Sequence, residues 1–232
     1  MAGVGMNRPD DRATSRARRR LPPLLAALAV LLVALWGFAA LAEGVISGDP
    51  IVDVDRAVAN WLHARATPAL TVFFVVITTF GSAWVLIPLA VGAVVLLMRR
   101  GRRADALLVF LAVGGAQLLT MALKAGFARE RPFFPDPLAT ESTFSFPSGH
   151  STNSLACYGV LAIVVARSRP DGAWRLRVAV PAAVLVLLIG FSRLYLGVHF
   201  LSDVLAGFAA GLTWLVLCTL AVFARRRTSR VG

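Results

Sequence analysis

Long apolar runs constrain the fold of this chain more than any other feature of its sequence. Of its 232 residues, 58% are hydrophobic, a fraction that a soluble domain of this size cannot bury but that a bilayer accommodates. Several runs reach or approach the roughly 20 residues that a helix needs to cross about 30 Å of hydrocarbon. The sequence therefore predicts an all-α, polytopic membrane protein.

The spacing of these runs predicts a six-transmembrane helix bundle with a short interfacial helix. The predicted spans are residues 21–41, 83–98, 104–127, 148–166, 178–193 and 198–223.

Two segments precede the second span. Residues 44–67 are mixed in character, and their apolar side chains fall at the spacing of an amphipathic helix lying at the interface. These apolar residues are Val54, Ala57, Val58, Trp61 and Leu62. Residues 70–80 are apolar but are interrupted at Gly81 and Ser82. We expect a bent or interfacial segment there, with the break at this Gly-Ser pair or elsewhere in the region.

The first run resembles a signal peptide in its Arg-rich flank and in the small residues at its end. It is longer than the roughly 7–15 apolar residues of a signal peptide, which favours a retained helix. We therefore predict one membrane domain over residues 21–223, with basic cytoplasmic tails at 1–20 and 224–232.

The formal net charge of +12 raises the possibility of nucleic-acid binding. The basic residues instead form clusters beside the apolar runs, at 16–20, 99–103, 167–177 and 225–230. No aromatic side chains interleave with them as a base-stacking surface requires. The pattern is typical of positive-inside topology in the cell membrane, with anionic headgroups and not nucleic acid as the partner.

Six spans with these clusters in the cytoplasm bring the other ends of the last four spans to the opposite face. Four cations lie near those ends without a topological reason: Lys124, Arg129, Arg131 and Arg193. Charges in such positions are candidates for function.

Three of these cations suit a tetrahedral dianion. Arg131 and Arg193 offer planar forks for phosphoryl oxygens, and Lys124 offers a point charge. Ser148 and Gly149 open the fourth span, where a hydroxyl and backbone N–H groups can face an anion. These five residues form the predicted phosphate site.

Two of the three histidines lie in the same segments. His199 and Asp203 are four residues apart at the start of the last span and so share a helix face. The carboxylate can accept the Nδ1 proton and leave Nε2 as a nucleophile. A metal held by His150, His199 and Asp203 is the alternative. The neighbouring cations would repel a divalent ion, so we expect no metal and no other cofactor.

The three segments resemble the signature of the type 2 phosphatidic acid phosphatase family. The signature reads Lys, six residues, Arg-Pro; then Pro-Ser-Gly-His; then Ser-Arg, five residues, His, three residues, Asp. Every position matches between residues 124 and 203. The resemblance implies that His199 attacks phosphorus, that His150 protonates the leaving oxygen and then activates water, and that Asp203 orients His199.

The predicted activity is hydrolysis of a lipid phosphate or pyrophosphate on the extracytoplasmic side. Undecaprenyl pyrophosphate, phosphatidylglycerophosphate and phosphatidic acid all fit. Transfer of the phosphoryl group to another acceptor is the alternative within enzymes. An anion transporter is the alternative outside them, although the motifs lack the second copy that inverted repeats would give.

Further residues beside the motifs are open to interpretation. We expect Arg129 to contact a headgroup, with Glu130 as its local partner. Four phenylalanines flank the same loop, and both a lipid entrance and an interfacial anchor fit them. They are Phe133, Phe134, Phe144 and Phe146.

Overall fold

The computed structural model of the chain describes residues 9–169 and 171–228, with side chains described between residues 24 and 225. All regular structure in these ranges is helical, which confirms the all-α prediction. The helices are α1 (Pro9–Ser47), α2 (Pro50–His63), α3 (Pro68–Thr79), α4 (Ala83–Arg99), α5 (Arg103–Phe127), α6 (Gly149–Ala166), α7 (Gly172–Tyr195) and α8 (Leu201–Thr228).

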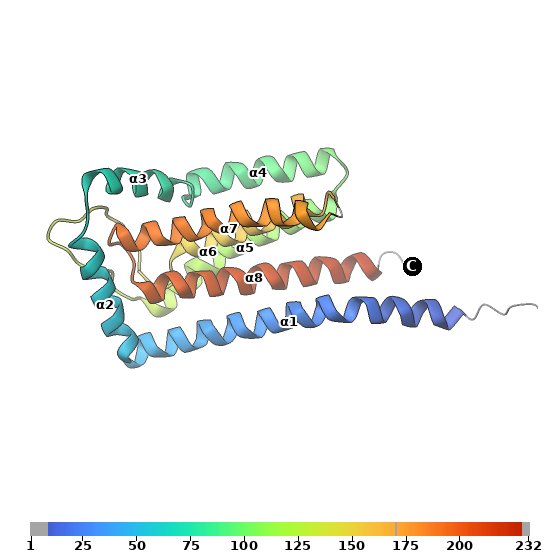
Figure 1. Cartoon of the computed structure of the whole chain (residues 1–232), viewed down its shortest axis with the longest axis horizontal. Helices are drawn as coiled ribbons and strands as arrows, with labels where there is room; N and C mark the ends of the chain where they lie inside the picture. The colour runs from blue at the N-terminus through green and yellow to red at the C-terminus, as the bar shows by residue number, and fades with distance from the viewer. Residues whose placement is uncertain (1–8, 170, 229–232) are drawn as a thin grey trace, which may run out of the picture.

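The long helices run side by side as one bundle, and α2 crosses one end of it (Figure 1). Within the described residues, five segments are long and apolar enough to span a membrane: Leu24–Ser47, Pro68–Arg99, Arg103–Phe127, Gly172–Tyr195 and Leu201–Arg225. The remaining bundle helix, α6, has 18 residues and packs against α5, α7 and α8. Five of the six predicted spans therefore overlap segments that could cross a membrane, the second of them only together with α3, and the remaining one is the central helix α6.

The predicted break before the second span lies where glycine and serine interrupt the apolar run. α3 ends at Thr79 and α4 begins at Ala83, and the two helices follow one another along the same side of the bundle (Figure 1). A Cβ on Gly81 would lie 2.5 Å from Ile189 Cγ2 and 3.0 Å from His150 Cδ2. The glycine therefore lets the break pack directly against the first turn of α6.

The predicted amphipathic helix is confirmed as α2, but only part of the predicted apolar face is buried, since Leu62 and Val58 pack inward. Asp55, Ala59 and Leu62 are buried against α7, α8 and α1, whereas Val54 and Trp61 are 45% and 56% exposed. The buried face therefore includes a carboxylate that apolar spacing could not identify.

The basic clusters and the motif segments lie at opposite ends of the bundle. Figure 1 shows four features at one end of the bundle: the α4–α5 connection, the α6–α7 connection, the N-terminal end of α1 and the C-terminal end of α8. Helix α2 lies at the other end. Residues 1–8 and 229–232 of the predicted tails lie outside the described residues. Residues 9–20 of the predicted N-terminal tail belong to α1.

Two glycines one turn apart bring α8 against the backbone of α6. A Cβ on Gly207 would lie 2.7 Å from the Ser148 carbonyl oxygen, and one on Gly211 would lie 2.7 Å from that of Thr152. Small residues at this spacing allow close helix approach in membranes, where packing rather than hydrophobic burial holds helices together.

We expect Gly211→Ala to lower the free energy of unfolding in detergent by about 1–3 kcal/mol, because the added methyl would force the helices apart. The matched control is Gly92→Ala in α4, where a Cβ meets no atom within 4 Å and alanine is the better helix former. Thermal or denaturant unfolding of the purified variants measures both. Equal stability of the two variants would contradict the tight α6–α8 contact.

Candidate active site

The three predicted segments meet in one cavity at the α2 end of the bundle. The cavity holds about 200 Å³ and is lined by predicted site residues from all three segments. These are Lys124, Arg131, Gly149, His150 and His199. The other predicted site residues, Ser148, Arg193 and Asp203, are buried.

His199 and Asp203 form the predicted pair at the start of α8. Nδ1 of His199 lies 3.3 Å from Asp203 Oδ2, and the ring is 2% exposed. Nε2 points the other way and lies 3.1 Å from Arg131 Nη1. Because an arginine can only donate, these partners assign the proton to Nδ1 and the lone pair to Nε2.

Burial also keeps this ring neutral. The low-polarity surroundings lower the pKa of His199 to about 4, although the adjacent carboxylate of Asp203 raises it. The ring therefore stays uncharged at neutral pH, which a nitrogen nucleophile requires.

Asp203 is held on both carboxylate oxygens. Oδ2 accepts from the Ser145 hydroxyl and, at 2.8 Å, from the Phe200 N–H. Oδ1 accepts from Arg129 Nη1 at 2.6 Å. A carboxylate with this many donors has one fixed orientation, so the His199 ring behind it is fixed as well.

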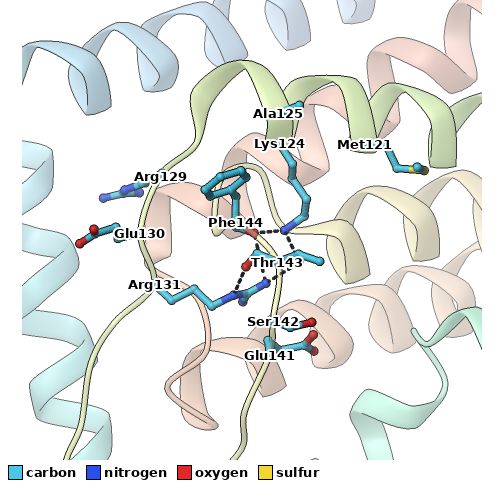
Figure 2. A pocket seen from close by; sticks show the side chains of 10 residues that line it. All are labelled: Met121, Lys124, Ala125, Arg129, Glu130, Arg131, Glu141, Ser142, Thr143 and Phe144. Atoms are coloured by element: carbon cyan, nitrogen blue, oxygen red, sulfur yellow. Dashed lines mark hydrogen bonds between the residues drawn. The ribbon is translucent and has the colours of Figure 1, made fainter.

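Arg129 lines the outer cavity and also makes internal contacts that the predicted headgroup contact did not include. Besides Asp203, its guanidinium donates to Asp55 Oδ2 at 2.8 Å and to Ser202 Oγ at 2.7 Å. It is therefore a largely buried cation between two buried carboxylates, and the ion pairs of its guanidinium are with Asp55 and Asp203 and not with Glu130. Figure 2 shows Arg129 and Glu130 pointing away from Lys124 and Arg131.

Asp55 connects α2 to this network. The carboxylate is fully buried, and it accepts from the Ser202 N–H at 2.8 Å as well as from the Ser202 hydroxyl. The interfacial helix is thus bonded to the first turn of α8, directly beside the His199–Asp203 pair.

Lys124 and Arg131 approach each other across residues 143–144 (Figure 2). Lys124 Nζ donates to the Phe144 carbonyl and lies 3.4 Å from Thr143 Oγ1. Arg131 donates to the Thr143 carbonyl from Nε at 2.6 Å. The loop that follows α5 therefore folds back to position both predicted phosphate ligands.

Arg193 reaches the same region from the end of α7. Its guanidinium donates to Thr78 Oγ1 at 2.7 Å and forms an ion pair with Glu141. Glu141 also lines the cavity, so its carboxylate lies among the cations that are predicted to hold phosphate. A phosphate dianion would compete with Glu141 for Arg193.

We expect Glu141→Gln to lower the inhibition constant of inorganic phosphate several-fold, because it removes a negative charge that competes for Arg193. The matched control is Glu130→Gln, which removes the same charge beside the outer cavity without an ion pair to Arg193. Inhibition of turnover by inorganic phosphate measures both. Equal effects of the two variants would show that the net charge near the site, and not the ion pair with Arg193, sets the inhibition constant of phosphate.

The Pro-Ser-Gly-His segment opens α6 as predicted. Ser148 is the N-cap of this helix, and its N–H donates to the Asp203 carbonyl at 2.9 Å. The hydroxyl accepts from Ser151 Oγ at 3.1 Å. Ser148 therefore joins α6 to α8 behind the cavity, while Gly149 and His150 line it.

The four phenylalanines differ in burial and in the residues that they contact. Phe146 is fully buried, whereas Phe133 is 88% exposed. Phe144 lines an outer cavity of about 610 Å³ that adjoins the site. Phe134 stacks on His63 of α2 with ring centroids 4.0 Å apart. Both interpretations therefore fit some of these residues, since one borders the outer cavity and others anchor the loop.

A metal site has no support from the described residues, among which no group of three or more His, Cys, Asp or Glu side chains could hold an ion.

Sequence reasoning missed several polar residues that contact the site. Asp55 lies on a helix whose sequence pattern predicts a surface position. Ser145 and Glu141 lie in a loop without hydrophobic periodicity. Their partners are residues far away in the sequence, so no local spacing identifies them. The one available signal was Arg129, a cation with no topological reason for its position.

Comparisons with known proteins agree with this geometry. Residues 105–227 match the family model of the PAP2 superfamily. The chain is 37% identical to phosphatidylglycerophosphatase B of Bacillus subtilis (strain 168) over 183 residues, covering 78% of this chain and 89% of that protein. It is 27% identical to an undecaprenyl-diphosphatase of Sulfolobus acidocaldarius over 182 residues, covering 76% and 82% respectively.

The fold is also similar to a solved structure. The crystal structure of a transmembrane PAP2-type phosphatidylglycerolphosphate phosphatase from Bacillus subtilis superimposes with a TM-score of 0.75 at 34% identity. The superposition covers 82% of this chain and 94% of that one. With the family match and the similarity over most of both chains, the chain belongs to the PAP2 superfamily as a multi-pass membrane phosphatase.

Proposed function

We propose that this chain hydrolyses a lipid phosphate ester through a phosphohistidine on His199. The observation that carries the proposal is the orientation of this ring. Nδ1 faces Asp203 at 3.3 Å, and Nε2 faces Arg131 in a cavity that Lys124 also lines. A phosphoryl group that draws Arg131 away from Nε2 would lie next to a neutral nitrogen whose lone pair is then available for attack.

The first step is attack of His199 Nε2 on phosphorus. A P–N bond forms, the bond to the leaving oxygen breaks, and His150 gives that oxygen its proton. Burial and the neighbouring cations disfavour the charged form of His150 in the free enzyme, so this step requires the bound phosphate dianion to keep the ring protonated. The Nδ1 proton stays between His199 and Asp203, whose charge stabilises the imidazolium that forms. Lys124, Arg131 and Arg193 offset the charge that develops on the phosphoryl oxygens, with the Gly149 N–H at the start of α6.

The second step releases phosphate. His150, now neutral, takes a proton from water, and the hydroxide oxygen bonds to phosphorus as the P–N bond breaks. His199 returns to its neutral form and inorganic phosphate leaves. These steps use side-chain cations in the place of a metal, so phosphate release is expected to continue in EDTA.

A lipid substrate is supported by the surroundings of the site and by the relatives. The cavity lies at one end of a bundle whose helices include five that are long and apolar enough to span a membrane. In a bilayer spanned by these helices, that end would lie near the headgroups. The relatives named above act, by their names, on phosphatidylglycerophosphate and on undecaprenyl diphosphate, and we propose a substrate of this class.

The test is phosphate release by the purified protein from mixed micelles of phosphatidylglycerophosphate, phosphatidic acid or undecaprenyl pyrophosphate. Acid-labile, alkali-stable radiolabel on the protein after quenching with a terminally labelled lipid would identify the phosphohistidine. Absence of release from all three lipids would overturn the proposal.

We further propose that the site faces away from the cytoplasm in the cell membrane. The support is that the basic clusters lie at the opposite end of the bundle, as the positive-inside rule requires. Single cysteines at exposed positions test this, because Cys157 and Cys218 are both buried. In intact cells, an impermeant maleimide should label Ser142→Cys at the site end and should label Arg100→Cys only after lysis. The reverse pattern would overturn this orientation.

A further inference from the structure

A pair of neutral amides lies one helical turn below the catalytic histidine. Asn153 Nδ2 donates to Gln117 Oε1 at 2.6 Å, joining α6 to α5. Asn153 follows His150 by three residues, which places it on the same helix face and about 4.5 Å further along the axis. Both amides line the 200 Å³ cavity that holds His150 and His199.

The same two residues line a second cavity. This apolar groove of about 340 Å³ runs between α4 and α5, and it shares Gly81, Ala83, Gln117 and Asn153 with the catalytic cavity. All its other described lining residues are apolar. The amide pair is therefore the polar boundary between the phosphate site and the apolar groove.

The pair has hydrogen-bonding capacity beyond its internal bond. Asn153 Oδ1 is buried and accepts no hydrogen bond from any residue in the described ranges. Gln117 is exposed to the cavity, and its terminal NH2 offers two donors. A buried polar atom without a partner is rare in folded proteins and calls for an explanation.

The charges around the pair restrict what can bind there. The cations that suit a phosphoryl group, Lys124 and Arg131, line only the catalytic side of the boundary. A second phosphate at the depth of the amides would enter a neutral, largely apolar space without a counter-charge, which is costly. A hydroxyl can instead both donate to and accept from an amide.

We propose that Gln117 and Asn153 bind a hydroxyl on the leaving alcohol, next to the scissile ester oxygen that His150 protonates. This inference rests on the proposed function and narrows it. The preferred substrate is a phosphate monoester of a lipid whose leaving group is neutral and carries a free hydroxyl, with its hydrocarbon chains directed to the α4–α5 groove. A lipid diphosphate, whose leaving group is charged, is the poorer substrate.

Three lipids in the same mixed micelles separate these chemistries. The leaving alcohol of 1-acylglycerol 3-phosphate (lysophosphatidic acid) is neutral and has a free hydroxyl, that of phosphatidic acid has only ester oxygens, and the leaving group of undecaprenyl pyrophosphate is a phosphate. We expect the wild type to show the highest kcat/KM for the first. Asn153→Leu and Gln117→Met should each lower that value about tenfold, the effect of one lost hydrogen bond, and should lower kcat/KM for phosphatidic acid by a smaller factor.

A gain of function provides the converse test. Gln117→Lys places a cation where the second phosphate of a diphosphate would lie, so it should raise the ratio of diphosphate to monoester turnover. The control is Thr213→Val in α8. It removes a buried hydroxyl that has no hydrogen-bond partner among the described residues, and Thr213 lines neither cavity. Its kcat/KM ratios should equal those of the wild type.

The outcomes of these tests distinguish the role assigned to Gln117 and Asn153 from the proposed phosphatase function. Equal kcat/KM of the wild type for all three lipids, or variants that lower all three by one common factor, would overturn the amide assignment and leave the phosphatase function standing. Failure of the wild type to hydrolyse any of them or phosphatidylglycerophosphate would overturn the proposed function and the assignment with it. If Asn153→Leu does not fold, Gln117→Met carries the same expectation, because its side chain faces the cavity.

Discussion

His199→Gln is expected to lower kcat by roughly four to six orders of magnitude, because glutamine offers no nitrogen nucleophile to phosphorus. The side chain is similar in volume and stays polar, so the Arg131 and Asp203 contacts can be partly kept. Phosphate release from the preferred lipid measures the loss. The same variant should give no acid-labile radiolabel on the protein.

Two controls make this result specific. His63→Gln changes the remaining histidine, which bonds to Asp136 at 3.0 Å and does not line the cavity, and it should leave most of the turnover. Binding of inorganic phosphate to His199→Gln should persist, because the cations are intact. Turnover of His199→Gln within tenfold of the wild type would remove this residue as the nucleophile.

Arg129→Met is expected to lower both stability and kcat. It leaves Asp55 and Asp203, which are both fully buried, without their shared cation. Removing one partner from a buried ion pair costs about 3–5 kcal/mol, because the remaining charge is uncompensated. The unfolding midpoint in detergent measures the first effect. The kcat should fall because Asp203 no longer holds His199 in one orientation.

A double variant separates positioning from stability. Asp55→Asn in the Arg129→Met background removes one of the two uncompensated charges, so it should recover part of the stability without restoring kcat. The matched control is Arg56→Met, next to Asp55 on α2, where an exposed pair with Asp53 at 3.9 Å is worth about 0–1 kcal/mol. If kcat recovers together with stability, Arg129 is a structural residue only.

The sequence was sufficient to predict those parts of the site whose geometry follows from the local spacing of residues. His199 and Asp203 are four residues apart on one helix, so their contact follows from helix geometry alone. Alternating ends of apolar spans bring Lys124, His150 and Arg193 to one face. In the structure Lys124 and His150 line one cavity, and Arg193 is paired with Glu141, which also lines it. The roles of these residues in catalysis remain predictions that the variants above test.

The parts that sequence analysis missed depend on contacts across the bundle. Asp55 lies 147 residues from Ser202, and only the packing of α2 on α8 decides that it is buried. Glu141 and Ser145 belong to a loop whose path has no periodic signal. Arg129 lies in the unconstrained spacer of the first motif, so its position indicated a function but not the partners that it binds.

The hydrogen bond from Ser148 N–H to the Asp203 carbonyl has a consequence for how such an enzyme can change in evolution. It links the helix that carries the proposed acid to the helix that carries the proposed nucleophile by main-chain atoms, which most substitutions leave in place. Glu141 and Phe144, in contrast, lie on the long loop between α5 and α6 and line the outer cavity, and loops tolerate side-chain changes and insertions better than helices do. Selection for a new headgroup can therefore act on the loop while the two proposed catalytic histidines keep their geometry.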